Sequence, residues 1–139
     1  TPHLSTGGMP EYLRNKIELL LPDNEVWVIE KNFEPAYRTV RDKIQSLIGN
    51  RLVNLGYNLQ KLPDLIKQIS PDVVHFEEIP QHFIDTKILD ILYTKERKYS
   101  IVVTTHSSTT DPSSIKYTAD KFVLVSSWSK NVFDNFYND

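Results

Sequence analysis

Short apolar runs alternate with segments of helical periodicity along the whole chain. The runs place valine, isoleucine and leucine on consecutive positions, which is typical of strands buried on both faces. Strands of this kind form parallel sheets that are covered by helices on each side. The expected strands are 25–30, 52–55, 72–77, 100–106 and 122–126. The sequence therefore predicts an α/β fold, a Rossmann-like three-layer sandwich around a mostly parallel sheet.

The segments between the runs repeat their apolar residues at three and four positions, as amphipathic helices do. Helices are expected over 10–21, 34–49, 59–69 and 127–137, and a long helix is expected to begin at Pro80. Its predicted buried stripe consists of Phe83, Ile84, Ile88, Ile91 and Leu92. The polar segment 107–114 has no such periodicity and contains Pro112, so we expect a loop there.

Composition limits the classes of protein to which the chain can belong. Its 139 residues suffice for one domain with a hydrophobic core, and 40% of them are hydrophobic. The formal net charge of −2 gives no basic field, so nucleic acid is not an expected partner. The absence of cysteine excludes disulfides, thiolate metal sites and cysteine nucleophiles. No apolar run approaches the roughly 18 residues of a membrane-spanning helix.

A glycine-containing loop at 1–10 leads directly into the first predicted helix. Gly7 and Gly8 have no Cβ, so backbone N–H groups there can approach a phosphate or a sugar closely. The helix start adds unpaired donors and partial positive charge, and Pro10 suits the first helical turn. A buried strand normally precedes such a loop and is not in the sequence. We therefore expect a fragment of a larger protein.

The polar residues at the strand ends are the candidates for a binding site, because ligands of open α/β sheets bind beyond the carboxyl ends of the strands. They provide hydroxyls, carboxylates and imidazoles without a cluster of arginine or lysine, which favours a polyhydroxylated ligand. The candidates are His3, Ser5, Thr6, Gly7, Gly8, Glu77, Glu78, Gln81, Thr105, His106, Ser107, Ser108, Ser126, Ser127 and Ser129.

Several of these residues have a structural interpretation beside the functional one. His106 is either a functional imidazole or a strand-end residue bonded to backbone, and His75 is expected to be a satisfied core residue. Glu77 and Glu78 either contact substrate or cap the following helix. The spacing of the histidines and glutamates matches no standard zinc pattern, so no metal is expected.

A cluster of basic residues on the second predicted helix offers a different partner. Arg38, Arg41 and Lys43 together are compatible with a surface that faces anionic lipid. Glu34 and Asp42 flank them, which favours a solvated helix face instead.

Four segments in this order resemble the N-terminal half of retaining GT-B glycosyltransferases of family 4. They read STGGMPE at 5–11, DVVHFE at 72–77, VTTH at 103–106 and ADKFVLVS at 119–126. The resemblance covers nearly the whole chain. One departure is the segment between His106 and Ala119, which holds only twelve residues and is shorter than usual.

The resemblance implies a Rossmann-like acceptor-side domain over residues 1–139, with the donor-binding C-terminal domain absent from the sequence. It assigns Gly7 and Gly8 to the donor-phosphate loop and His106 to catalysis beside the transferred sugar. Glu77, Glu78 and Ser126 fall on the acceptor side. The implied partners are a nucleotide-sugar donor and a carbohydrate or lipid-linked acceptor, and no metal cofactor is implied. The expected location is cytoplasmic, with a membrane surface as a further partner if the acceptor is lipid-linked.

Two other functions remain open at this level. A nucleotide-sugar epimerase or a phosphorylase shares the GT-B architecture. A non-catalytic Rossmann-like binding domain shares the fold of the single domain. The absence of a first strand argues against the binding domain, whereas an epimerase or a phosphorylase is separated from a transferase by whether the complete protein transfers a sugar to an added acceptor.

Overall fold

The computed structural model describes residues 1–107 and 109–138, so Ser108, one of the expected site residues, lies outside the described part. The chain divides into two compact units, residues 1–59 and residues 60–139. Each unit combines helices with short parallel strands.

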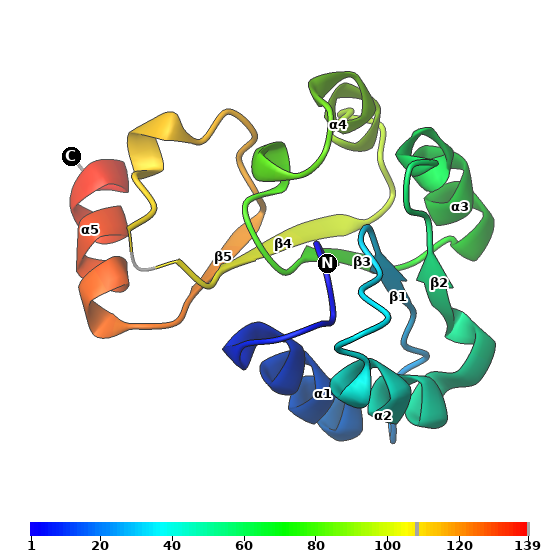
Figure 1. The fold of residues 1–139 in the computed structure, drawn as a ribbon. Coiled ribbons are helices and arrows are strands. Elements are labelled where there is room, and N and C mark those ends of the chain that lie inside the picture. The colour runs from blue at the N-terminus through cyan, green and yellow to red at the C-terminus, as the bar shows by residue number, and fades with distance from the viewer. Residues whose placement is uncertain (108, 139) are drawn as a thin grey trace. The chain divides into compact units, whose positions relative to one another are not determined.

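The first unit contains α1 (Gly8–Leu20), β1 (Val28–Glu30), α2 (Thr39–Ile48) and β2 (Leu52–Asn54). The strands β1 and β2 pair in parallel, with Ile29 opposite Val53. The first residues of the chain run beside β1 and form a parallel bridge between His3 and Asn32. The loop at the start of the chain is therefore held against the carboxyl end of β1 (Figure 1).

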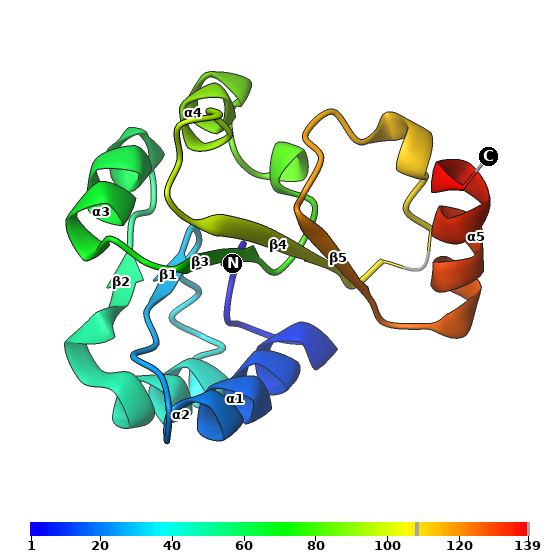
Figure 2. The ribbon, with the colours of Figure 1, turned by 180° about the vertical axis from the view of Figure 1, so that it is seen from behind.

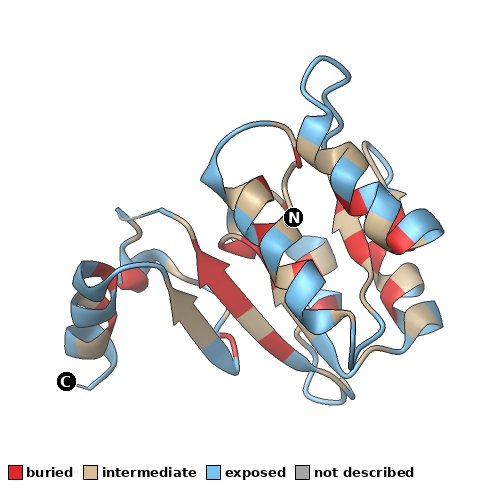
Figure 3. Ribbon diagram, turned by 90° about the horizontal axis from the view of Figure 1, so that it is seen from below, coloured by how far each residue is buried: buried red, intermediate tan, exposed pale blue. Residues whose placement is uncertain are grey.

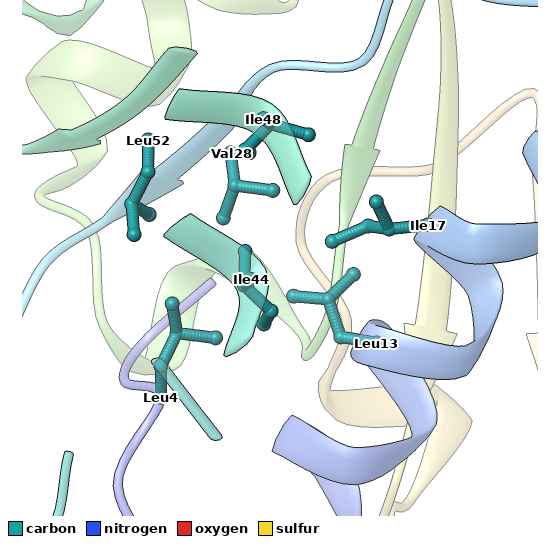
Figure 4. Packing of buried hydrophobic residues seen from close by; sticks show 7 residues of the cluster. All are labelled: Leu4, Leu13, Ile17, Val28, Ile44, Ile48 and Leu52. Carbon is teal, nitrogen blue, oxygen red and sulfur yellow. The ribbon is translucent and has the colours of Figure 1, made fainter. Parts of the chain in front are cut away.

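The core of the first unit lies between the two helices and β1–β2 (Figure 4). The helices each turn one face inward, since Leu13 and Ile17 of α1 and Ile44 and Ile48 of α2 are spaced four residues apart. The buried cluster consists of Leu4, Leu13, Ile17, Val28, Ile44, Ile48 and Leu52.

The helix α2 begins at Thr39, five residues later than the predicted start at Glu34. Pro35 disfavours helical backbone at the residue before it, and the amide of Tyr37 donates to the Glu34 carbonyl in a turn. Tyr37 is 57% exposed, so it does not face the core.

The second unit contains α3 (Leu62–Ile69), β3 (Val73–Phe76), α4 (Thr86–Leu92), β4 (Ser100–Thr105), β5 (Lys121–Leu124) and α5 (Ser127–Tyr137). The strands form one parallel sheet in the order β3-β4-β5 (Figure 2). The central strand β4 is the most buried strand of this sheet, whereas most residues of α5 are exposed (Figure 3). Four of the six residues of β4 are buried: Ile101, Val103, Thr104 and Thr105.

The long helix predicted from Pro80 is wrong, because the segment is divided into two pieces. A single 3-10 turn, Pro80–His82, is followed by Phe83 with φ −140°, which ends the helical backbone. Asp85 then starts α4 by accepting a hydrogen bond from the amide of Lys87. The inward face also differs from the predicted stripe, since Leu89 is buried whereas Ile91 is 58% exposed.

The expected alternation of helices and parallel strands is confirmed as a mixed α/β fold. In the part of the chain that the structure describes, the strands form a two-stranded and a three-stranded sheet instead of the single sheet that was predicted. The segment expected to be a loop, 107–114, contains only the short turn Pro112–Ser114 among its described residues. Among the described residues, no helix combines the length and apolarity required to cross a membrane.

Candidate functional site

The register of β3 and β4 brings a row of polar side chains together in the second unit. His75 pairs with Val102 and Phe76 with Val103. Side chains two residues apart lie on the same face of a strand, so His75 and Glu77 share a face. Thr104 and His106 follow Val102 on the corresponding face of β4. The carboxyl ends of β3 and β4 therefore place a carboxylate beside an imidazole.

A hydrogen bond at these strand ends joins His106 to Glu77. The Nε2 atom of His106 lies 3.1 Å from Oε2 of Glu77. Glu77 is buried, at 3% exposure, whereas the side chain of His106 remains 17% exposed. The histidine thus has contact with solvent, and its carboxylate partner does not.

The second imidazole in this row is that of His75. Its Nε2 atom lies 2.7 Å from the hydroxyl oxygen of Thr104 and 3.8 Å from Oε1 of Glu77. Thr104 is fully buried at 0% exposure, so this bond satisfies a hydroxyl inside the sheet. The imidazole of His75 is therefore hydrogen-bonded as expected, but its side chain is 19% exposed and does not lie in the core.

The carboxylate of Glu78 accepts hydrogen bonds from backbone amides and does not cap the following helix. Its Oε1 accepts a hydrogen bond from the amide of Ile79 at 2.9 Å, and its Oε2 accepts one from the amide of His106 at 3.4 Å. The alternative in which Glu77 or Glu78 caps the next α-helix is wrong, since Asp85 caps α4. Glu78 instead ties the loop after β3 to the end of β4.

Ser126 is the N-cap of α5. Its hydroxyl oxygen accepts a hydrogen bond from the amide of Ser129 at 3.1 Å. It also lines an open groove of about 550 Å³ between β5 and α5. The aromatic rings of Phe122, Phe133 and Tyr137 line the same groove. The structure therefore places this predicted residue at a helix start with an aromatic surface next to it.

Gly7 and Gly8 lie in the first unit at the start of α1. Gly7 has φ 97° and ψ −179°, a conformation that is almost restricted to glycine. It is the N-cap of α1, and no side chain caps the helix there. Both glycines are exposed, with open space where a Cβ would stand. The first amides of α1 are therefore not covered by a side-chain cap.

A buried ion pair in the first unit was missed by the sequence analysis. Glu30, at the carboxyl end of β1, has 0% exposure, and its Oε1 lies 2.6 Å from Nε of Arg41 on α2. The Arg41 guanidinium also lies over the ring of Phe33, 4.5 Å from its centroid. The interpretation of Arg41 as part of a solvated basic face is wrong, because its side chain is only 13% exposed. The sequence shows a glutamate at the end of an apolar strand but does not show that it is buried.

The pKa values of Asp120 and Tyr93, near the sheet of the second unit, are shifted from their ordinary values. The amide of Ile101 and the guanidinium of Arg97 both donate to Asp120, and these bonds lower the pKa of its carboxyl group. Burial raises the pKa of Tyr93 well above its ordinary value. In residues 1–107 and 109–138, no group of three or more histidine and acidic side chains has an arrangement that could hold a metal ion.

Comparison of the chain with protein-family models, with curated proteins and with solved structures found no match. The interpretation of the site therefore depends on its own geometry and on the order of the sequence motifs.

Proposed function

We propose that this chain is the acceptor-side part of a retaining glycosyltransferase that uses a nucleotide-sugar donor. The observation that carries the proposal is the His106–Glu77 pair at the carboxyl ends of two neighbouring parallel strands. Imidazole both donates and accepts protons near neutral pH. The strand ends of an open α/β sheet are also where ligands of such folds bind.

The proposed reaction exchanges one bond at the anomeric carbon of the donor sugar. The bond from that carbon to the phosphate oxygen breaks, and a bond to the acceptor hydroxyl oxygen forms on the same face. The proton of the acceptor hydroxyl moves to the departing phosphate oxygen. Negative charge grows on the phosphate as the first bond breaks, so hydrogen-bond donors placed there lower the barrier.

Each proposed site residue has a role that its chemistry permits. In the first unit, the first amides of α1, following Gly7, have the donor chemistry that a phosphate needs. The His106 imidazole donates to or accepts from a hydroxyl of the transferred sugar. Glu78 and the groove beside Ser126 are the proposed acceptor contacts, because carboxylates and aromatic rings suit hydroxyls and the apolar faces of sugars.

The proposed function requires a second, donor-binding domain, and for a lipid-linked acceptor it also requires a membrane surface. A donor-binding domain supplies the contacts to the nucleotide, and this chain by itself is expected to be inactive. The acceptor is a carbohydrate or a lipid-linked carbohydrate, and for the latter the protein works at a membrane surface. The proposed location is cytoplasmic.

The test of the catalytic assignment is the variant His106→Ala in the full-length protein that carries this chain. We expect sugar transfer to fall roughly 10²-fold or more, the size of a lost transition-state hydrogen bond. His82→Ala is the matched control, because His82 is exposed and lies on the turn before α4. Equal turnover in the two variants would remove His106 from the mechanism.

The same assay separates the two rival functions. An epimerase would change the donor sugar without needing an acceptor, and a phosphorylase would need inorganic phosphate to split a glycosidic bond. A binding domain would retain ligand tightly and release no nucleotide under any condition.

A further inference from the structure

The carboxylate of Glu77 lies between two imidazoles but is bonded to them unequally. Its Oε2 lies 3.1 Å from Nε2 of His106, and its Oε1 lies 3.8 Å from Nε2 of His75. The first distance is that of a hydrogen bond and the second is too long for one. His75 has a shorter contact with the hydroxyl of Thr104, at 2.7 Å. The directional bond of Glu77 to an imidazole is therefore the one with His106.

This bond determines which nitrogen of His106 carries the proton. A neutral imidazole has one N–H donor and one nitrogen lone pair, and an ionised carboxylate only accepts. With Glu77 as a carboxylate, Nε2 carries the hydrogen that it shares with Glu77, since two facing lone pairs would repel each other. In the neutral ring the basic lone pair then belongs to Nδ1.

The burial of Glu77 sets it apart from the other glutamate of this loop. At 3% exposure its carboxylate is shielded from solvent, and the two neighbouring strands hold it in place. Glu78 is only partly buried and receives backbone amides. A buried, fixed carboxylate is suited to orienting a neighbouring ring and not to contacting an acceptor in solution.

We propose that Glu77 is a positioning residue that fixes the Nε2–H tautomer of His106 and makes Nδ1 its proton-accepting nitrogen. The tautomer follows from the geometry of the pair together with the carboxylate form of Glu77. Its catalytic consequence rests on the proposed glycosyltransferase function. In that reaction His106 offers a lone pair at Nδ1 to a sugar hydroxyl.

The test is a long-range ¹H–¹⁵N NMR spectrum of the histidine rings of the 139-residue chain, recorded at a pH where they are neutral. His106→Asn identifies the His106 signals by their loss. The expected pattern is one protonated nitrogen at Nε2 and one unprotonated nitrogen at Nδ1. Glu77→Gln and Glu77→Ala are expected to convert this pattern into a mixture of tautomers, and Glu78→Gln is expected to leave it unchanged.

The outcomes separate this inference from the proposed function. A His106 ring with its proton on Nδ1 in the wild-type chain overturns the inference, and so does an unchanged tautomer in both Glu77 variants. Even if the Glu77 variants do not fold, a wild-type proton on Nδ1 would by itself overturn the inference. An Nε2–H tautomer in a protein that transfers no sugar supports the inference and contradicts the proposed function. In an active full-length protein, Glu77→Gln should lower kcat at least tenfold with little change in KM.

Discussion

The buried ion pair of the first unit provides the sharpest prediction of stability. Glu30 is fully buried, and Arg41 Nε donates to its Oε1 at 2.6 Å. The other carboxylate oxygen, Oε2, is buried without a hydrogen-bond partner among the described residues. Arg41→Met would therefore leave both oxygens of a buried anion without a donor. Breaking a buried ion pair in this way costs about 3–5 kcal/mol of unfolding free energy.

Two comparison variants make the prediction specific to buried charge. Arg38 is the N-cap residue of the same helix and pairs with Asp42 in solvent, with 54% of the Arg38 side chain exposed. Arg38→Met should have a much smaller effect, because exposed pairs contribute little. The double variant Glu30→Met with Arg41→Met removes both charges and should recover most of the loss, since an apolar pair of similar volume is often as stable as a buried ion pair.

Urea unfolding followed by tryptophan fluorescence measures these differences. Trp27 lies in the first unit and Trp128 in the second. In a Trp128→Phe background, Trp27 alone reports on the unit that contains the ion pair. Trp128 is 58% exposed, so its replacement should perturb little. An Arg41→Met loss below about 1 kcal/mol, or a double variant no more stable than Arg41→Met, would refute the reasoning.

Three further predictions concern the loop before α1, the start of α5 and the carboxylate before β5. Gly7→Ala should destabilise the first unit by about 1–3 kcal/mol, because φ 97° is strained for any side chain. Gly8→Ala, in the first turn of α1, should be neutral or slightly stabilising in the same urea titration. Ser126→Ala should cost the second unit about 0.5–2 kcal/mol through loss of the N-cap, and unchanged stability would contradict the cap assignment. The pKa of Asp120 is lowered from its usual 3.8, so its bonds add stability above that pH, and this stability is lost as the pH falls through the folded-state value. Asp120→Asn should flatten the dependence of stability on pH below about 4, and an equal acid dependence in both proteins would show that the bonds from the Ile101 amide and Arg97 do not stabilise the charge.

The strands and most helices could be predicted from the sequence because local periodicity determines them. The predicted helix at Ser127–Tyr137 has the bounds of α5, and every predicted strand overlaps an observed one. The division of the helix after Pro80 was not predictable from its apolar stripe. There the side chain of Asp85 caps a new helix, so the helix from Pro80 does not continue. The hydrogen bond of this cap does not depend on the spacing of apolar residues, so the hydrophobic pattern does not reveal it.

The candidate site could be predicted in part. Position at a strand end identified both His106 and Glu77, but their contact depends on the register of β3 with β4, which single-strand patterns do not fix. The Glu30–Arg41 pair was missed for a related reason. A charge at the end of an apolar strand is ordinarily assigned to solvent, and only the packing of α2 reveals that it is buried.

The central claim is that the residues around His106 serve sugar transfer. The most direct measurement is a donor screen on the full-length protein, with nucleotide release and sugar transfer followed together over a panel of nucleotide-sugars and acceptors. The account predicts transfer with retained anomeric configuration, dependent on His106 and absent from the 139-residue chain by itself. Tight ligand binding by the short chain, with no nucleotide released by the full-length protein, would contradict it.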